Sequence, residues 1–364
     1  FRQSTRINKV FPKDHRLYEP PMDLPPMVLA EAVYSTSLEE VNPLNKSGFG
    51  KFTFERLIQA TLLDLVDRGH LSIFQGDEEP YLRIISEKGL SNFEKECLRM
   101  TLSNKKKLAV SELFPDYQIS SSLYRGAKES DEKHIRETGL RLKRSFEGRL
   151  QRIQSCVKDK VHVLRIPSYY RPLTSEERRL ALGMRVCSAI TALGGLLFFY
   201  YSWQTHGFFS VPFLILGLTG LGSSFWVHFA MRGAYRDGVL TEEGAEIFYL
   251  WTSFENMLRD IAHLDQAELE SIVVWNRLLV YATLFGYAKK VSKLMKVRHI
   301  QLENPDLNLY IAYGWHAQFH ASTAQIKQYT TIANTASNYS VSSGSGSSGG
   351  GFSGGGGGGS IGAF

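Results

Sequence analysis

The chain has 364 residues, enough for two or three domains, and carries a net charge of +6 with a pI near 9.0. Its three cysteines (Cys97, Cys156 and Cys187) are scattered and odd in number, which excludes a disulfide framework and the paired cysteine spacing of a zinc site. The mild basicity suits nucleic acid or an anionic membrane surface, and a mean hydropathy of −0.18 is expected when apolar spans are averaged with charged soluble parts.

The N-terminal part predicts a linker followed by a small domain. Residues 1–24 are polar and contain prolines, so we expect an extended linker. Residues 25–90 show the pattern of two helices and two strands: Pro26 suits a first helical turn, and Thr53 can cap a second helix that Gly69 ends. The two segments that follow this helix, residues 71–74 and 81–85, have the composition of strands. This order predicts a winged-helix-like domain.

In a DNA-binding winged helix, the second helix enters the major groove. The charges on this helix are acidic Glu55, Asp64 and Asp67 beside basic Arg56 and Arg68. Its attraction for phosphate is therefore weak. We favour a structural or protein-interaction role for the domain and keep DNA binding as the alternative.

Residues 91–170 have the pattern of a charged, mainly helical region. One amphipathic face includes Phe93 and Leu98, and another includes Phe146 and Leu150, with arginines and lysines between them. Contact with a membrane surface is one interpretation of these charges, and a solvated helix face is the simpler one.

A stretch of 46 residues, Val186 to Met231, contains no Lys, Arg, Asp or Glu. One helical span needs about 20 apolar residues, so this stretch is long enough for two. Polar residues 204–207 divide it, which predicts a transmembrane helical hairpin of residues 183–203 and 208–231 within 183–231. Arginines lie on both flanks and no charge lies in the connection, so both flanks are expected in the cytoplasm.

Small residues in the two spans predict close helix packing. Gly194 and Gly195 on the first span are expected to meet Gly217, Gly220 and Ser224 on the second. The only titratable side chain deep in the second span is His228, near its cytoplasmic end. Transporters usually need ionisable groups at mid-membrane, so a transport role is disfavoured.

Residues 236–330 have amphipathic helical patterns and predict a cytoplasmic helical domain. Residues 333–364 are rich in Gly and Ser and predict a disordered tail. Inside that tail, G-x-G-x-x-G at residues 344–349 and G-x-S-x-G at residues 351–355 are attributed to composition, because no strand or helix pattern flanks them.

His316 and His320 lie four residues apart and would share one face of a helix, as zinc ligands do. No glutamate follows His316 as a metalloprotease would require, and no third ligand stands out. A packed helix end is the favoured interpretation, and we expect no metal, cofactor or catalytic residues anywhere in the chain.

Several motifs resemble the C-terminal part of the YciQ-like predicted membrane proteins, a bacterial family of unknown function. They are the Tyr18-Glu19-Pro20-Pro21 step, the helix end at 65–71, the Thr241-Glu242-Glu243-Gly244 step, the helix from Trp251 to Asp260, the helix from Trp275 to Val291, and the Gly/Ser-rich tail. The resemblance covers most of residues 15–364 and implies a bacterial plasma-membrane location. It also implies an exported N-terminal domain and an earlier span that this chain lacks, so we expect the chain, which opens on Phe1, to be a fragment.

These patterns together predict a mainly α membrane protein with a transmembrane hairpin between two cytoplasmic parts. No nucleophile–base pair or metal cluster stands out, and the resemblance brings no active-site residue. We therefore expect a non-catalytic, membrane-anchored scaffold or interaction protein. Its expected partners are the lipid bilayer, other proteins and a second copy of itself, whereas nucleic acid is disfavoured. The alternative is a membrane-tethered winged-helix regulator that binds DNA.

Overall fold

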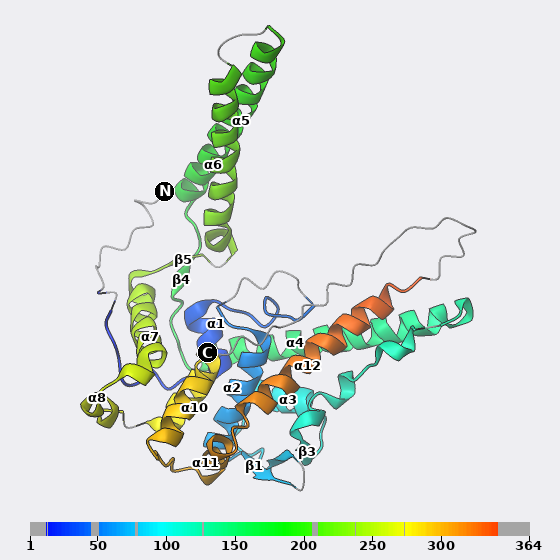
Figure 1. The fold of residues 1–364 in the computed structure, drawn as a ribbon, viewed down its shortest axis with the longest axis vertical. Helices are drawn as coiled ribbons and strands as arrows, with labels where there is room; N and C mark the ends of the chain where they lie inside the picture. The colour runs from blue at the N-terminus through cyan, green and yellow to red at the C-terminus, as the bar shows by residue number, and fades with distance from the viewer. Residues whose placement is uncertain are drawn as a thin grey trace.

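A hairpin of two long helices projects from a mainly helical body in the computed structural model of this chain (Figure 1). The structure describes residues 12, 14–44, 51–76, 79–125, 127–205, 210–236, 238–272 and 274–340. The body is built from chain segments on both sides of the hairpin.

The first segment of the body contains α1 (Pro26–Tyr34), α2 (Phe54–Asp67), α3 (Asn92–Leu102) and α4 (Glu132–Val163), with strands β1 (Leu71–Gln75), β2 (Pro80–Ile84) and β3 (Lys107–Ala109). The hairpin consists of α5 (Ser175–Gln204) and α6 (Ser210–Arg236). The second segment contains α7 (Glu242–Asp260), α8 (Gln266–Glu270), α9 (Trp275–Phe285), α10 (Ala288–Val297), α11 (Pro305–Ala312) and α12 (His316–Ser337). Two short strands, β4 (Tyr170–Arg171) and β5 (Val239–Leu240), pair at the base of the hairpin.

Local signals set the bounds of the first elements, as predicted. The Thr53 hydroxyl accepts a hydrogen bond of 3.4 Å from the Arg56 backbone N–H at the start of α2. Gly69 follows α2 with a φ of +73°, a conformation that favours glycine. The β1–β2 hairpin is antiparallel, and β3 adds to it in the order β1-β2-β3.

The hairpin helices were predicted as two, and α5 begins earlier and α6 ends later than the predicted spans. A reciprocal capping box explains the early start of α5. The Thr174 hydroxyl accepts a hydrogen bond of 3.3 Å from the Glu177 N–H, and the Glu177 carboxylate accepts one of 2.8 Å from the Thr174 N–H. The helix therefore begins in the charged segment and runs on into the apolar one.

The body segments before and after the hairpin share one hydrophobic core. Helix α2 packs against α1, α9 and α12, so chain from both segments surrounds it. Tyr34 of α1 lies edge-on to Phe285 of α9, with ring centroids 5.9 Å apart. Trp251 of α7 is likewise edge-on to Tyr281 of α9 at 5.1 Å. Each segment thus supplies part of the apolar surface that the other buries.

In this arrangement α2, the second helix of the predicted winged helix, is largely buried and is not available to bind DNA. The order of two helices and a β-hairpin is present, yet 11 of the 14 residues of α2 are buried. The residues that are not buried are Glu55, Arg56 and Asp67. With only these three residues partly exposed, α2 has no continuous face to place in a major groove.

Helices α4 and α12 lie side by side and form an arm that extends away from the body (Figure 1). Gly139 of α4 sits against the backbone of α12, where an added Cβ would collide with Ala333 and Ser337. The prediction that the disordered tail begins at residue 333 is therefore wrong for residues 333–337, because they complete α12 and pack on α4. Residues 341–364, including both glycine motifs, lie outside the described residues.

Residues 14–24, part of the predicted linker, have no helix or strand and pack on the body. The Leu17 N–H donates to the Ser253 carbonyl at 3.2 Å. Arg16 forms ion pairs of 3.3 Å with both Asp260 and Glu268. The segment is therefore extended and is held against α7 and α8.

Candidate functional site

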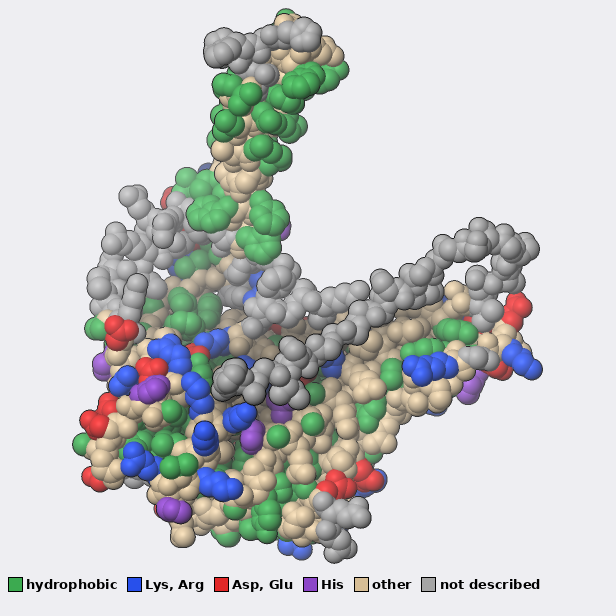
Figure 2. All heavy atoms as spheres, in the orientation of Figure 1, with side chains coloured by type: hydrophobic (Ala, Val, Ile, Leu, Met, Phe, Trp, Pro, Cys, Tyr) green, Lys and Arg blue, Asp and Glu red, His purple; other side chains and the backbone are tan. Residues whose placement is uncertain are grey.

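The outer surface of the hairpin is apolar over most of its length (Figure 2). Both helices are long and apolar enough to cross a membrane, and only 17% of the most apolar window of each is buried. The exposed side chains include Ile190, Leu193, Leu197, Phe198, Val211, Ile215, Leu218 and Phe225. Such a surface in water would mark an interaction site or a membrane contact, and its helical length matches a bilayer.

Small residues bring α5 and α6 together, largely as predicted. An added Cβ on Gly195 would collide with the backbone of Gly217, and one on Gly220 would collide with the backbone of Ala192. The prediction is wrong for Gly194, where an added Cβ would meet no atom within 4 Å. Close backbone approach replaces the hydrophobic effect as the source of helix contact in lipid.

Charged side chains gather where the hairpin joins the body. The Arg171 guanidinium donates two hydrogen bonds, of 2.9 and 2.7 Å, to the Glu177 carboxylate. Arg185 lies 5.0 Å from the ring centroid of Tyr235. Arg236 pairs with Glu40 of the body at 2.8 Å. These contacts and the β4–β5 pair tie both ends of the hairpin to one place.

A buried ion network holds α2 to α9. Arg277, whose side chain is 16% exposed, pairs with Asp64, which is 1% exposed, and with Asp23 at 2.5 Å. Asp67 lies 3.6 Å from Arg277, and Arg68 approaches Asp64 to 2.7 Å and extends the network to α3. Burial raises the pKa of Asp67, and the positive charge of Arg277 opposes this. The network is structural, because its buried carboxylates pair with Arg277 and Arg68, although the buried Arg277 Nε has no hydrogen-bond partner among the described residues.

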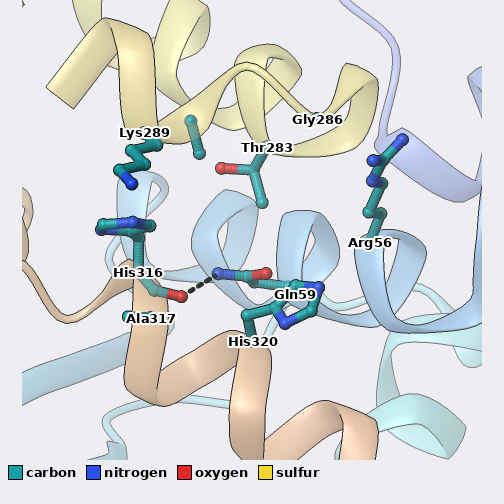
Figure 3. Close-up of a pocket in the computed structure, with 9 residues that line it drawn as sticks. Arg56, Gln59, Thr283, Gly286, Lys289, His316, Ala317 and His320 are labelled. Atoms are coloured by element: carbon teal, nitrogen blue, oxygen red, sulfur yellow. Dashed lines mark hydrogen bonds between the residues drawn. The ribbon is translucent and has the colours of Figure 1, made fainter. Parts of the chain in front are cut away.

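A pocket of about 340 Å³ lies on the body between α2, the α9–α10 junction and α12 (Figure 3). Its lining consists of Arg56, Gln59, Thr283, Gly286, Ala288, Lys289, His316, Ala317 and His320. Gln59 forms part of the floor, where its amide donates to the Tyr310 hydroxyl at 3.0 Å and to the His316 carbonyl at 3.3 Å. The hollow lies on a face where Lys, Arg and His side chains gather over α10 and α12 (Figure 2).

The histidine pair weighed for zinc, His316 and His320, does share one face of α12 and lines this pocket. The pair faces the basic side chains of Arg56 and Lys289, which repel a metal cation. Across the described ranges, no group of three or more His, Cys, Asp or Glu side chains could hold a metal. His228 is exposed on α6, beside the ring of Phe229.

Sequence reasoning missed Arg56 and Lys289 as pocket residues. The only signal available was the i, i+4 spacing of the histidines, since the basic residues come from two other segments of the chain.

A family model described as the C-terminal domain of a predicted membrane protein (DUF2207) matches residues 14–295. The match includes the first segment of the body, the whole hairpin and the second segment as far as residue 295 in α10, whereas α11 and α12 lie beyond it. No curated protein and no solved structure matches the chain.

Proposed function

The chain belongs to this family of predicted membrane proteins, and from that premise we propose that it is a membrane-anchored interaction protein whose body lies on the cytoplasmic side of a bacterial plasma membrane. The hairpin α5–α6 is the anchor, and the body is the working part. The proposed role is non-catalytic: the body presents binding surfaces at a fixed place on the membrane.

The observation that carries the proposal is the exposed apolar surface of α5 and α6. Tyr200, Tyr201 and Trp203 lie at the far end of α5 and are 61%, 68% and 66% exposed. Aromatic side chains of this kind favour the interface between lipid and water. Basic residues Arg171, Arg178 and Arg185 lie at the opposite end, as expected for the cytoplasmic side.

The shared core supports a topology with both flanks on one side of the membrane. The body needs chain from before α5 and from after α6 to bury α2. A single span, or three spans, would place the two segments on opposite sides and leave the core of each incomplete.

The arm formed by α4 and α12 supports an interaction role. It extends beyond the rest of the body (Figure 1), and α4 carries exposed Lys133, Arg141 and Arg144 beside exposed Glu137, while Arg136 pairs with Glu132 at 3.5 Å. An exposed, charged arm of this kind suits a partner protein of complementary charge. DNA binding is not proposed, because its candidate recognition helix is buried.

Cysteine labelling in intact cells tests the topology. In a background with Cys156 and Cys187 replaced by alanine, new cysteines are placed at Arg165, Gln204 and Lys290 (each as Xaa→Cys). Native Cys97 remains silent, because burial raises the pKa of its thiol to about 12. The positions before and after the hairpin should react with an impermeant maleimide only after lysis, whereas position 204 should react in intact cells. Labelling of positions 165 and 290 from opposite sides would refute the topology.

Affinity purification from cross-linked native membranes tests the interaction role. The full chain should recover a partner at a comparable molar amount. The double variant Arg141→Glu/Arg144→Glu should lose that partner while remaining folded, because both side chains are exposed. A matched charge reversal on the body, Lys293→Glu with Lys290→Glu, should retain it. Recovery of the chain alone would contradict the proposal.

A further inference from the structure

The pocket between α2, α9, α10 and α12 brings together four basic side chains, those of Arg56, Lys289, His316 and His320. In the part of the chain that the structure describes, no carboxylate lines the pocket. None of the four forms an ion pair with a described Asp or Glu. The two fixed positive charges, on Arg56 and Lys289, therefore have no carboxylate beside them in the pocket lining.

We propose that this pocket binds a phosphate group, carried either by a small soluble molecule or by the headgroup of an anionic lipid. Its volume of about 340 Å³ lies within the range of small-molecule sites, about 300–1,000 Å³. A phosphate accepts several hydrogen bonds from different directions, and the guanidinium, ammonium and imidazole groups approach from different elements (Figure 3).

The backbone is shaped to admit the Arg56 guanidinium. Gly286 ends α9 with a φ of +87°, and an added Cβ there would collide with that guanidinium. Only glycine therefore combines this turn with this position of Arg56. The side chain of Arg56 is half-buried, so it reaches the pocket with much of its stem fixed.

The starts of two helices add to the positive field. Ala288 and Lys289 belong to the first turn of α10, and His316 and Ala317 belong to the first turn of α12. The first N–H groups of a helix lack intrahelical partners and carry the positive end of its dipole. Two such ends beside one hollow favour an anion more than either would alone.

The pKa of His316 is affected by its position in the pocket. Burial lowers its pKa, and the charges of Lys289 and His320 lower it further, while the Gly314 carbonyl opposes the shift. Its Nδ1 atom is buried and has no hydrogen-bond partner among the described residues. A bound phosphate would offset the neighbouring charges.

Histidine protection tests the proposal on the full chain in nanodiscs. Modification by diethylpyrocarbonate is quantified at each histidine by mass spectrometry, with exposed His320 as the reporter and exposed His263 as the internal control. One arm adds inorganic phosphate to phosphatidylcholine nanodiscs. The other arm omits phosphate and compares phosphatidylcholine with phosphatidylcholine containing phosphatidic acid. Protection of His320 in the first arm identifies a soluble ligand, and protection in the second identifies a headgroup.

Three variants distinguish a built site from a diffuse basic surface. Arg56→Gln and Lys289→Gln should each raise the half-protecting phosphate level by about tenfold or more, the size expected for loss of one charged hydrogen bond. Lys293→Gln removes the same charge from the same helix outside the pocket and should change the half-protecting phosphate level by less than about twofold. Because Lys289 is exposed, its variant tests the site even if Arg56→Gln does not fold.

Absence of His320 protection in both arms would overturn the proposal. So would an equal loss of protection in Lys293→Gln and Lys289→Gln. Neither result depends on the membrane topology of the chain, so failure here is separate from failure of the proposed function.

Discussion

Arg277→Met should destabilise the body by about 3 kcal/mol, because it leaves buried carboxylates without their central cation. Methionine retains much of the apolar stem, so the change is mainly one of charge. Asp64 is 1% exposed and cannot regain water when the guanidinium is removed. Loss of one partner of a buried ion pair typically costs about 3–5 kcal/mol.

The lower end of that range applies here for two reasons. Arg68 remains 2.7 Å from Asp64 and keeps part of the compensation. Asp23 is 76% exposed, so its pairing with Arg277 contributes only about 0–1 kcal/mol. With about 2 °C per kcal/mol for a large domain, the apparent Tm should fall by about 6 °C.

The assay is thermal unfolding of the detergent-purified chain, followed by circular dichroism. Arg259→Met is the matched control: its side chain is 52% exposed, and we expect a change within about 0.5 kcal/mol. Burial already raises the pKa of Asp67 against the charge of Arg277, so the variant raises that pKa further. The loss of stability of Arg277→Met relative to wild type should therefore shrink as the pH falls through the raised pKa of Asp67, because a protonated carboxyl is no longer a buried charge. An Arg277→Met variant as stable as the control would refute the reasoning.

Three further predictions concern the hairpin and the α3–α4 contact. Leu197→Arg places a charge on the apolar face of α5 and should make membrane insertion less favourable by about 2.5–3.5 kcal/mol. A smaller fraction of the protein should therefore remain in the membrane after carbonate extraction, whereas Leu197→Ala should behave as wild type. Gly195→Val should lower hairpin stability by about 1–3 kcal/mol through overpacking, measured as the apparent Tm in detergent, while Gly194→Val, which meets open space, should not. Burial alone would raise the pKa of Glu96, but hydrogen bonds led by that from Arg149 lower it, so its stabilising contribution is complete above about pH 4.3 and is lost as the pH falls through the lowered pKa. The stability gap between wild type and Glu96→Gln should accordingly close on acidification, and a gap independent of pH would contradict this.

Local patterns predicted the elements of the body well. Caps and periodicity act within one or two turns, so Thr53, Gly69 and the apolar spacing of α2 were sufficient to place that helix. The same locality explains why the sequence did not show that α2 lies in the core, and the winged-helix-like domain stays a prediction. Whether a helix lies at the surface and can bind DNA or lies in the core depends on which elements pack against it. The helices α9 and α12, which pack against α2, follow the hairpin in the chain, so local patterns around α2 do not show them.

The ion network and the pocket could not be predicted for the same reason. Asp64 stands in an apolar run with no local sign of its partner, which is 213 positions away. The i, i+4 spacing of His316 and His320 is visible in the sequence, but this spacing alone fits zinc as well as an anion. The charge of Arg56 and Lys289 decides between the two, and only the fold brings those side chains to the histidines.

The shared core also has a consequence for biosynthesis. Helix α2 leaves the ribosome about 200 residues before α9, the first of its two main partners from the far side of the hairpin. Protein synthesis proceeds at about 5–20 residues per second, so the apolar surface of α2 remains without this packing partner for about 10–40 s. In the proposed anchor, insertion of α5 and α6 into the bilayer would fall within that interval and would precede completion of the fold. Chains stalled before α9 should therefore be bound by chaperones and sensitive to protease, even when their hairpin is correctly inserted.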